Sequence, residues 1–256
     1  MKRIVSMSAL AALVMGGAAT QAAAATATAA LDVNSAYVWR GLTFNNGLVL
    51  QPSITAAADN GFSVNVWGNY DIDDYDGDIE EYHFSEVDLT ASYAFKLGAV
   101  DTTVGAIAYT FPTTHPDNLD GAGTDYASTT EIFLGLGYDL GYGFSIAGNI
   151  YYDVDQVDDF YLTAGLKYTY EINEKTALSL GALISYAGED FTDYYAGGTD
   201  SGFFNYILNS SLSYQVTDAF GVSANIAFTD SMDDDALPDE AVHTNVYGGI
   251  GLTYTF

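Results

Sequence analysis

The chain of 256 residues contains 34 acidic side chains and only six Lys or Arg, a net charge of −28 that excludes nucleic acid as a partner. Its 21 Tyr, 14 Phe and 49% apolar residues exclude a disordered polyanion. The sequence contains no cysteine, so it can form neither a disulfide nor a thiolate metal site.

Residues 1–25 have the three parts of a secretory signal peptide. A basic start at Lys2 and Arg3 precedes a short apolar run and an alanine tract with small-x-small sites. The run is shorter than the ~20 apolar residues of a transmembrane helix, and no later segment reaches that length. We therefore predict that residues 26–256 form the mature protein. Its remaining cations are Arg40, Lys96, Lys167 and Lys175.

Twelve segments with alternating apolar and polar residues follow the predicted signal peptide. They span residues 31–40, 49–58, 61–72, 83–95, 101–111, 129–138, 144–153, 160–171, 177–187, 203–216, 220–229 and 244–256. Each has about the ~10 residues that a tilted strand needs to cross a bilayer, and short turns alternate with longer acidic loops between them. This pattern predicts an all-β fold, a transmembrane antiparallel up-and-down β-barrel of about 12 strands in the outer membrane, with both termini periplasmic.

Aromatic side chains fall at both ends of the apolar faces of these segments. A barrel that crosses two membrane interfaces needs two such belts, whereas a soluble β-sandwich has no reason to form them. The predicted girdle consists of Trp39, Tyr70 and Tyr109 at the loop end and Tyr170, Tyr254 and Phe256 at the turn end. Because outer-membrane barrels recurrently end on phenylalanine, we expect the last segment to close the barrel against the first. We also expect it to engage the barrel-assembly machinery, with outer-membrane lipids around the wall.

The first three segments carry a recognisable pattern. The stretch Ser35-Ala36-Tyr37-Val38-Trp39-Arg40-Gly41, followed by Gln51-Pro52, Gly61-Phe62 and Trp67-Gly68-Asn69, resembles the TorF-type porin family. The resemblance implies an outer-membrane barrel with channel function. The stretch Gln51-Pro52-Ser53 departs from the Gly-rich continuation of that family. Because Pro52 has no N–H to donate, we also expect the second strand to bend or pair poorly there.

The opposite face of the segments is polar, which predicts a wet lumen. Acidic residues and one arginine fall in its loop-side half, where they would form a constriction that favours cations. The predicted constriction contains Arg40, Asp71, Glu86, Asp88, Glu131, Asp153 and, lower down, Lys167; the predicted pore aromatics are Trp67, Tyr151, Tyr161 and Tyr247. Two alternatives stay open: the acids could form salt bridges that brace the wall, and the aromatics could fill the lumen instead of stacking on sugars.

The sequence therefore predicts a passive channel for small hydrophilic solutes, cationic or neutral, with no cofactor and no metal site. The alternative is a non-conducting structural or surface-interaction barrel whose acidic loops bind cations. Residues 71–81 have carboxylates spaced somewhat like calcium ligands, although the register and helices of an EF-hand are missing. Infolding of residues 112–128 would plug the pore.

A lipid hydrolase is the remote alternative. His83-Phe84-Ser85 has the two-apart spacing of the lipid-facing His and Ser in outer-membrane phospholipases. The predicted outward neighbours, Gly68, Tyr70, Tyr109 and Phe111, include no amide or carboxylate that could orient an imidazole. We therefore expect that the protein is not an enzyme.

Overall fold

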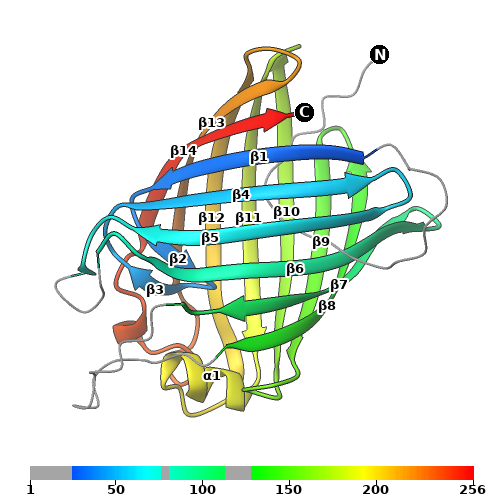
Figure 1. Ribbon diagram of the computed structural model, residues 1–256. Helices are drawn as coiled ribbons and strands as arrows, with labels where there is room; N and C mark the ends of the chain where they lie inside the picture. The colour runs from blue at the N-terminus through cyan, green and yellow to red at the C-terminus, as the bar shows by residue number, and fades with distance from the viewer. Residues whose placement is uncertain (1–24, 76–80, 113–127) are drawn as a thin grey trace.

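The computed structural model describes residues 25–75, 81–112 and 128–256; the predicted signal peptide and most of the 112–128 loop lie outside these ranges. Twelve strands close into one antiparallel barrel in the order β1-β14-β13-β12-β11-β10-β9-β8-β7-β6-β5-β4 (Figure 1). This is the predicted all-β architecture. It is also the fold of bacterial outer-membrane proteins, because a closed barrel pairs every strand edge without help from water.

The barrel strands agree closely with the predicted segments. They are β1 (Ala25–Asn34), β4 (Val49–Ala58), β5 (Phe62–Asp71), β6 (Phe84–Leu97), β7 (Val100–Thr110), β8 (Thr129–Gly141), β9 (Phe144–Asp153), β10 (Phe160–Asn173), β11 (Thr176–Ala187), β12 (Gly202–Gln215), β13 (Phe220–Ser231) and β14 (Val246–Thr255). Every strand after the first begins and ends within three residues of its predicted segment. Pro52 interrupts pairing as expected, because the β4–β5 ladder stops after Leu50 and resumes at Ser53.

The last strand closes the barrel, as predicted. β14 pairs antiparallel with β1, with Leu252 opposite Leu31, and pairs with β13 on its other side. The backbone N–H of Phe256 extends the ladder by donating to the carbonyl of Ala27 at 2.9 Å. The two strands that would otherwise have open edges therefore satisfy each other.

The predicted first strand, 31–40, is wrong by six residues. The barrel strand β1 ends at Asn34, and the chain then leaves the wall. The following residues form a separate two-stranded hairpin, β2 (Tyr37–Trp39) and β3 (Leu42–Asn45), at the loop end of the barrel (Figure 1). Residues 25–30 alternate as well as residues 35–40 do, so the pattern alone could not choose between them. The ladder with β4, from Ala25 opposite Ala58 to Asn34 opposite Val49, selects the earlier segment.

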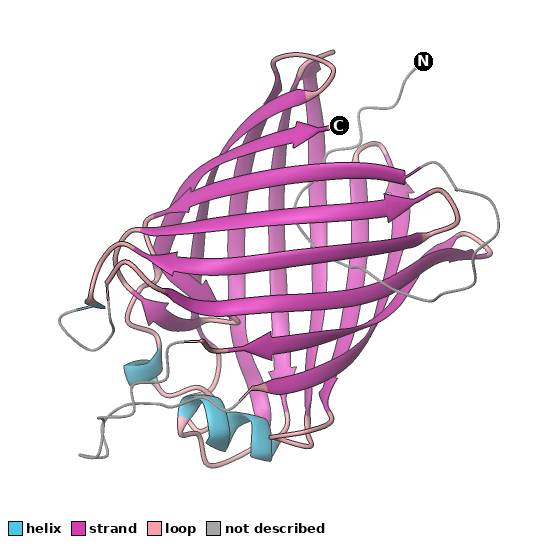
Figure 2. Ribbon diagram, viewed as in Figure 1, coloured by secondary structure: helices cyan, strands magenta, loops and turns pink. Residues whose placement is uncertain are grey.

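The helices lie together at the loop end, where the long connections meet (Figure 2). The helix α1 (Glu189–Ala196) follows β11, and the 3-10 helix η2 (Asp239–Ala241) precedes β14. Asp159 accepts the N–H of Phe191 in the first turn of α1 at 3.1 Å, and Gly197, with φ 68°, ends the helix. Within the ranges that the structure describes, no helix has the length and apolar character needed to span a membrane.

Candidate functional site

The inner wall of the barrel is lined by polar side chains that bond across neighbouring strands. Asn34 Nδ2 donates to Gln51 Oε1 at 2.8 Å, and Gln51 Nε2 donates to Asn69 Oδ1 at 3.0 Å. Large apolar residues of the same sheet point outward; Ile54 and Leu89, for example, are 52% and 53% exposed. The polar face therefore lies inside and the apolar face outside, the reverse of a water-soluble barrel.

The hairpin β2–β3 occupies the loop end of this lumen. Its two-residue turn is Arg40-Gly41, with φ of 52° and 92°, as a type I′ turn requires. Glycine adopts this conformation freely, whereas arginine is strained by it. A Cβ on Gly41 would lie 2.9–3.0 Å from the side chain of Asn205 on β12. The tip of the hairpin is therefore in tight contact with the inner wall.

Arg40 at this tip forms a bidentate ion pair with Glu131 on β8. Its two terminal nitrogens donate to Oε1 at 2.7 Å and to Oε2 at 2.6 Å, and the two side chains are 8% and 1% exposed. Tyr109 on β7 adds a third hydrogen bond, from Oη to Glu131 Oε2 at 2.9 Å. Removing either partner of so buried a pair would leave an uncompensated charge.

Four aromatic rings surround the Arg40 guanidinium. The distances from Cζ to the ring centroids are 4.3 Å for Trp39, 4.6 Å for Tyr151, 4.4 Å for Tyr161 and 5.4 Å for Phe191. Burial acts to lower the pKa of Arg40, but the carboxylate of Glu131 outweighs it and the pKa is raised overall. The side chain therefore stays cationic within an aromatic box that favours a cation.

Two further acidic residues of the wall hold the hairpin strands. Tyr37 Oη donates to Glu86 Oε2 on β6 at 2.7 Å, and Asn45 Nδ2 donates to Asp71 Oδ1 on β5 at 2.6 Å. Burial and the nearby charge of Glu86 raise the pKa of Tyr37 well above its ordinary value of 10.0. The phenol therefore remains a donor at neutral pH.

An apolar cluster packs at the same end of the barrel. Its buried members come from the hairpin, the inner wall, α1 and the connections around it: Leu42, Val157, Tyr161, Ala187, Phe191, Phe204, Ala236, Leu237 and Val242. Phe191, Phe204 and Leu237 are completely buried. The hairpin is thus packed against α1 on one side and bonded to the polar wall on the other.

The acids predicted to line a constriction are largely engaged in these contacts. Asp71, Glu86 and Glu131 bind hairpin side chains. Asp153 accepts the hydroxyl of Thr129 and the backbone N–H groups of the three residues 155–157, so it shapes the loop after β9.

Asp88 is 9% exposed, and its Oδ1 has no hydrogen-bond partner within the described residues. Lys167 is half-buried lower on the wall, where Gly181 of β11 pairs with it. The effect of these residues on permeating ions stays a prediction.

Two of the six predicted girdle residues are wrong. Trp39 lies on the hairpin and not on a barrel strand, and its ring packs 5.1 Å from that of Tyr195 on α1. Tyr109 is 6% exposed, because the register of β7 places it opposite the lumen-facing Asp88. β7 carries small residues on its outer face, so its sequence did not show which parity faces out. Of the other four, Tyr170, Tyr254 and Phe256 are 53%, 47% and 74% exposed, and Tyr70 packs against the exposed Phe84; their role in a membrane girdle stays a prediction.

Three of the four predicted pore aromatics contact the hairpin. Trp67 lies 5.7 Å from the ring of Tyr37, and Tyr151 and Tyr161 belong to the box around Arg40. Tyr161 also donates from Oη to Asn205 Oδ1 at 2.9 Å. Tyr247 on β14 is half-buried. Trp67, Tyr151 and Tyr161 therefore pack at the loop end of the lumen, and stacking of solutes on any of the four rings stays a prediction.

The lipid-facing His–Ser arrangement of the hydrolase alternative is not formed. An irregularity in the β5–β6 register places Phe84 opposite Tyr70 on the outer face. Ser85 consequently faces the lumen, where its hydroxyl accepts from Asn69 Nδ2 at 2.9 Å. His83 Nδ1 lies 2.9 Å from the carbonyl of Glu81. The two residues therefore do not share the outer face.

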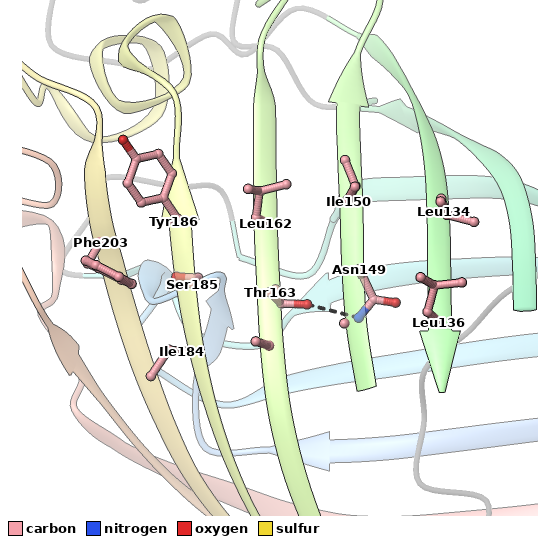
Figure 3. A pocket seen from close by; sticks show the side chains of 12 residues that line it. Leu134, Leu136, Asn149, Ile150, Leu162, Thr163, Ile184, Ser185, Tyr186 and Phe203 are labelled. Atoms are coloured by element: carbon pink, nitrogen blue, oxygen red, sulfur yellow. Dashed lines mark hydrogen bonds between the residues drawn. The ribbon is translucent and has the colours of Figure 1, made fainter. Parts of the chain in front are cut away.

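A hollow of about 360 Å³ lies across strands β8–β12 (Figure 3). Gly148 and Ala164 leave space between larger outward side chains. Those side chains are Leu134, Leu136, Ile150, Leu162, Ile184, Tyr186 and Phe203. The hydrogen bond from Asn149 to Thr163, drawn in the same view, belongs to the polar inner face. The hollow is therefore a feature of the apolar outer surface and not of the lumen.

Solved structures with a similar fold include outer-membrane porins. The KdgM porin in complex with disordered oligogalacturonate is 11% identical, with 90% of this chain and 99% of that chain covered and a TM-score of 0.55. The NanC porin is 13% identical, with 88% and 98% covered and a TM-score of 0.54. An outer membrane channel from Pseudomonas putida F1 is 13% identical, with 93% and 97% covered and a TM-score of 0.59. At these identities the likeness establishes the fold alone.

No curated protein matches this sequence. A family described as "Bacterial protein of unknown function (Gcw_chp)" matches residues 18–248. This match spans the barrel strands up to the beginning of β14, together with the hairpin that the barrel encloses. The chain therefore belongs to the Gcw_chp family.

Proposed function

We propose that this protein is an outer-membrane channel for the passive diffusion of small hydrophilic solutes. The observation that carries the proposal is the polar lumen, in which side chains such as Asn34, Gln51 and Asn69 face inward from a closed barrel. Twelve strands at ~4.8 Å spacing and ~40° tilt give a backbone diameter of about 24 Å, wide enough for a water-filled path beside an inserted hairpin. The similarity of the fold to that of solved porins supports the same proposal.

The solutes are cationic or neutral. The hydrogen-bond donors to Asp71 are the neutral amides of Asn45 and Asn69, so these donors cancel none of its negative charge. Arg40, the cation at the loop end, is committed to Glu131. An acidic wall of this kind lowers the barrier for cations and raises it for anions.

The TorF-type resemblance is retained as part of this proposal. Its central motif, Tyr37 to Gly41, forms the first strand and the turn of the hairpin, and three of its residues contact the wall or the aromatic box. A porin family marked by this motif would conserve a constriction element inside the barrel. Membership of that family would therefore assign the hairpin a role in permeation.

Planar-bilayer recording of the purified, folded protein tests the proposal. We expect discrete conductance steps and, under a KCl gradient, a reversal potential biased towards the cation. Asp71→Asn, whose amide oxygen can replace Oδ1 as the acceptor, should reduce that bias, whereas Asp139→Asn at the exposed turn end of β8 should leave it unchanged. A folded barrel that gives no steps contradicts the channel, and an anion-biased reversal potential contradicts the proposed selectivity.

A non-conducting barrel is the second candidate, and the apolar cluster at the loop end favours it. Leu42, Phe191 and Leu237 are buried where a porin would have its entrance, and such a core excludes water. In that case the exposed loops would be the working surface. Bilayer recording separates the candidates, because this one predicts a folded barrel that stays silent at every voltage.

A further inference from the structure

We propose that the hairpin β2–β3 is a displaceable gate of this channel and that the ion pair between Arg40 and Glu131 is its latch. The inference rests on the proposed channel function and adds the regulation of the same lumen. Its basis is the way in which the hairpin is attached: the hairpin lies within the barrel without being part of the barrel wall.

The wall is complete without the hairpin. β1 and β4 pair directly along their whole length, from Ala25 opposite Ala58 to Asn34 opposite Val49, although residues 35–48 lie between them in the chain. The hairpin strands pair with each other in a separate two-stranded sheet. Removing the hairpin from the lumen therefore breaks no strand pair of the barrel.

The two ends of residues 35–48 are fixed, which defines the points about which the hairpin can move. The N–H of Ser35 donates to the carbonyl of Gly248 at 2.9 Å, and the N–H of Ile72 donates to the carbonyl of Leu48 at 3.1 Å. Between these points, side chains fasten the hairpin to three separate wall strands, through Tyr37, Arg40 and Asn45. Side-chain contacts can be released while the backbone ladders stay intact.

The attachment of Arg40 is the strongest of the three, because it is a bidentate ion pair. Without that pair, Arg40 would also be the least stable of the three residues in its position. Its backbone is strained at φ 52°, and its guanidinium is removed from water by four rings. With Glu131 ionised, the bidentate pair compensates that desolvation. Without the carboxylate, the arginine would be a buried unpaired charge, and the hairpin would gain by carrying it out of the lumen into water.

Displacement would change both the width and the charge of the lumen. Two paired strands with their side chains occupy ~10 Å of a barrel about 24 Å across, so the open path should conduct at least about twofold more. It would also expose Asp71, Glu86 and Glu131, whose hairpin partners leave with it. The open state is therefore wider and more acidic than the closed state.

Single-channel recording of matched variants tests the gate. The first variant replaces residues 36–46 by a short Gly-Ser linker; we expect it to show the open conductance continuously. Glu131→Gln should visit that level in transient steps, because it removes the carboxylate that pairs with Arg40. Asp101→Asn is the control, because it breaks the exposed ion pair with Lys96 at the turn end and should change nothing. The heat-induced gel shift of a folded barrel confirms that each variant is assembled.

The outcomes separate the gate from the channel function. If the wild type conducts and the linker variant conducts no more, the channel stands and the gate is overturned. If Glu131→Gln remains at the wild-type level, the latch is overturned; should that variant fail to fold, Arg40→Lys, which keeps the charge but loses the bidentate geometry, replaces it with the same expectation. A silent wild type with a conducting linker variant contradicts a passive channel that is open at rest, but it supports a gate that is closed at rest. Silence of both overturns the gate and the channel function together.

Discussion

Replacing Phe191 by alanine should loosen the loop end of the barrel without unfolding the wall. The ring of Phe191 is completely buried, with ring centroids 4.7 Å from Tyr195, 5.3 Å from Tyr161 and 5.6 Å from Phe204. Truncating such a residue removes its burial and leaves a cavity, which costs about 3–5 kcal/mol. Because α1 and the hairpin meet at this ring and lie outside the barrel ladders, that cost falls on their docking.

A cost of this size raises the population of the undocked state by roughly two to three and a half powers of ten. Hydrogen exchange of the protein in detergent measures it, since local opening exposes the amides of residues 37–45 and 189–196. Tyr194→Ala on the same helix is the matched control, because that side chain is 38% exposed. If Phe191→Ala leaves the exchange of these amides unchanged, the apolar cluster does not hold the hairpin and α1 in place. If amides over the whole barrel wall lose protection from exchange, the cost does not fall on docking alone.

One substitution and one truncation test other parts of the structure. Gly41→Ala should weaken hairpin docking by about 1–3 kcal/mol, because its Cβ would meet Asn205 at 2.9–3.0 Å in a left-handed turn. Gly98→Ala is the control, because Gly98 is also left-handed but lies in open space. An equal effect of the two substitutions on hydrogen exchange of the hairpin would count against the contact with Asn205. A chain without Tyr254–Phe256 loses the pairs of β14 with Ala29 and Phe220, so it should not assemble into a heat-modifiable barrel through the assembly machinery; recovery of such a barrel would contradict this role of the last strand.

Alternation predicted the barrel because the lipid and the lumen impose opposite demands on alternate residues of every strand. The rule failed where both faces carry small or mixed residues. In β1 it could not distinguish Ala25–Asn34 from the predicted segment 31–40, and in β7 it could not show that Tyr109 faces inward. Pairing with the neighbouring strands determines both the bounds of β1 and the face on which Tyr109 lies, because register depends on two segments at once.

The sequence predicted several residues of the candidate site, but not the contacts that they make with the hairpin and with α1. The pattern placed Arg40 and Glu131 together in the loop-side half of the lumen, and they form an ion pair there. It did not find Tyr37, Asn45 or Phe191, because their partners lie on distant parts of the chain. One local signal was available: Arg40-Gly41, between alternating residues, resembles a two-residue hairpin turn. Its inclusion in a barrel strand concealed that signal.

The buried acidic side chains of the inner wall need hydrogen-bond donors, and the hairpin supplies them. Asp71, Glu86 and Glu131 are 1%, 3% and 1% exposed, and carboxylates so buried are unfavourable unless donors satisfy them. The hairpin supplies an amide, a phenol and a guanidinium to them from one short segment. If the hairpin leaves, only water can replace these donors, so an open lumen must be hydrated. The same three residues are thereby shielded from water in the closed state and exposed to it in the open state, which couples conductance to cation preference through one element.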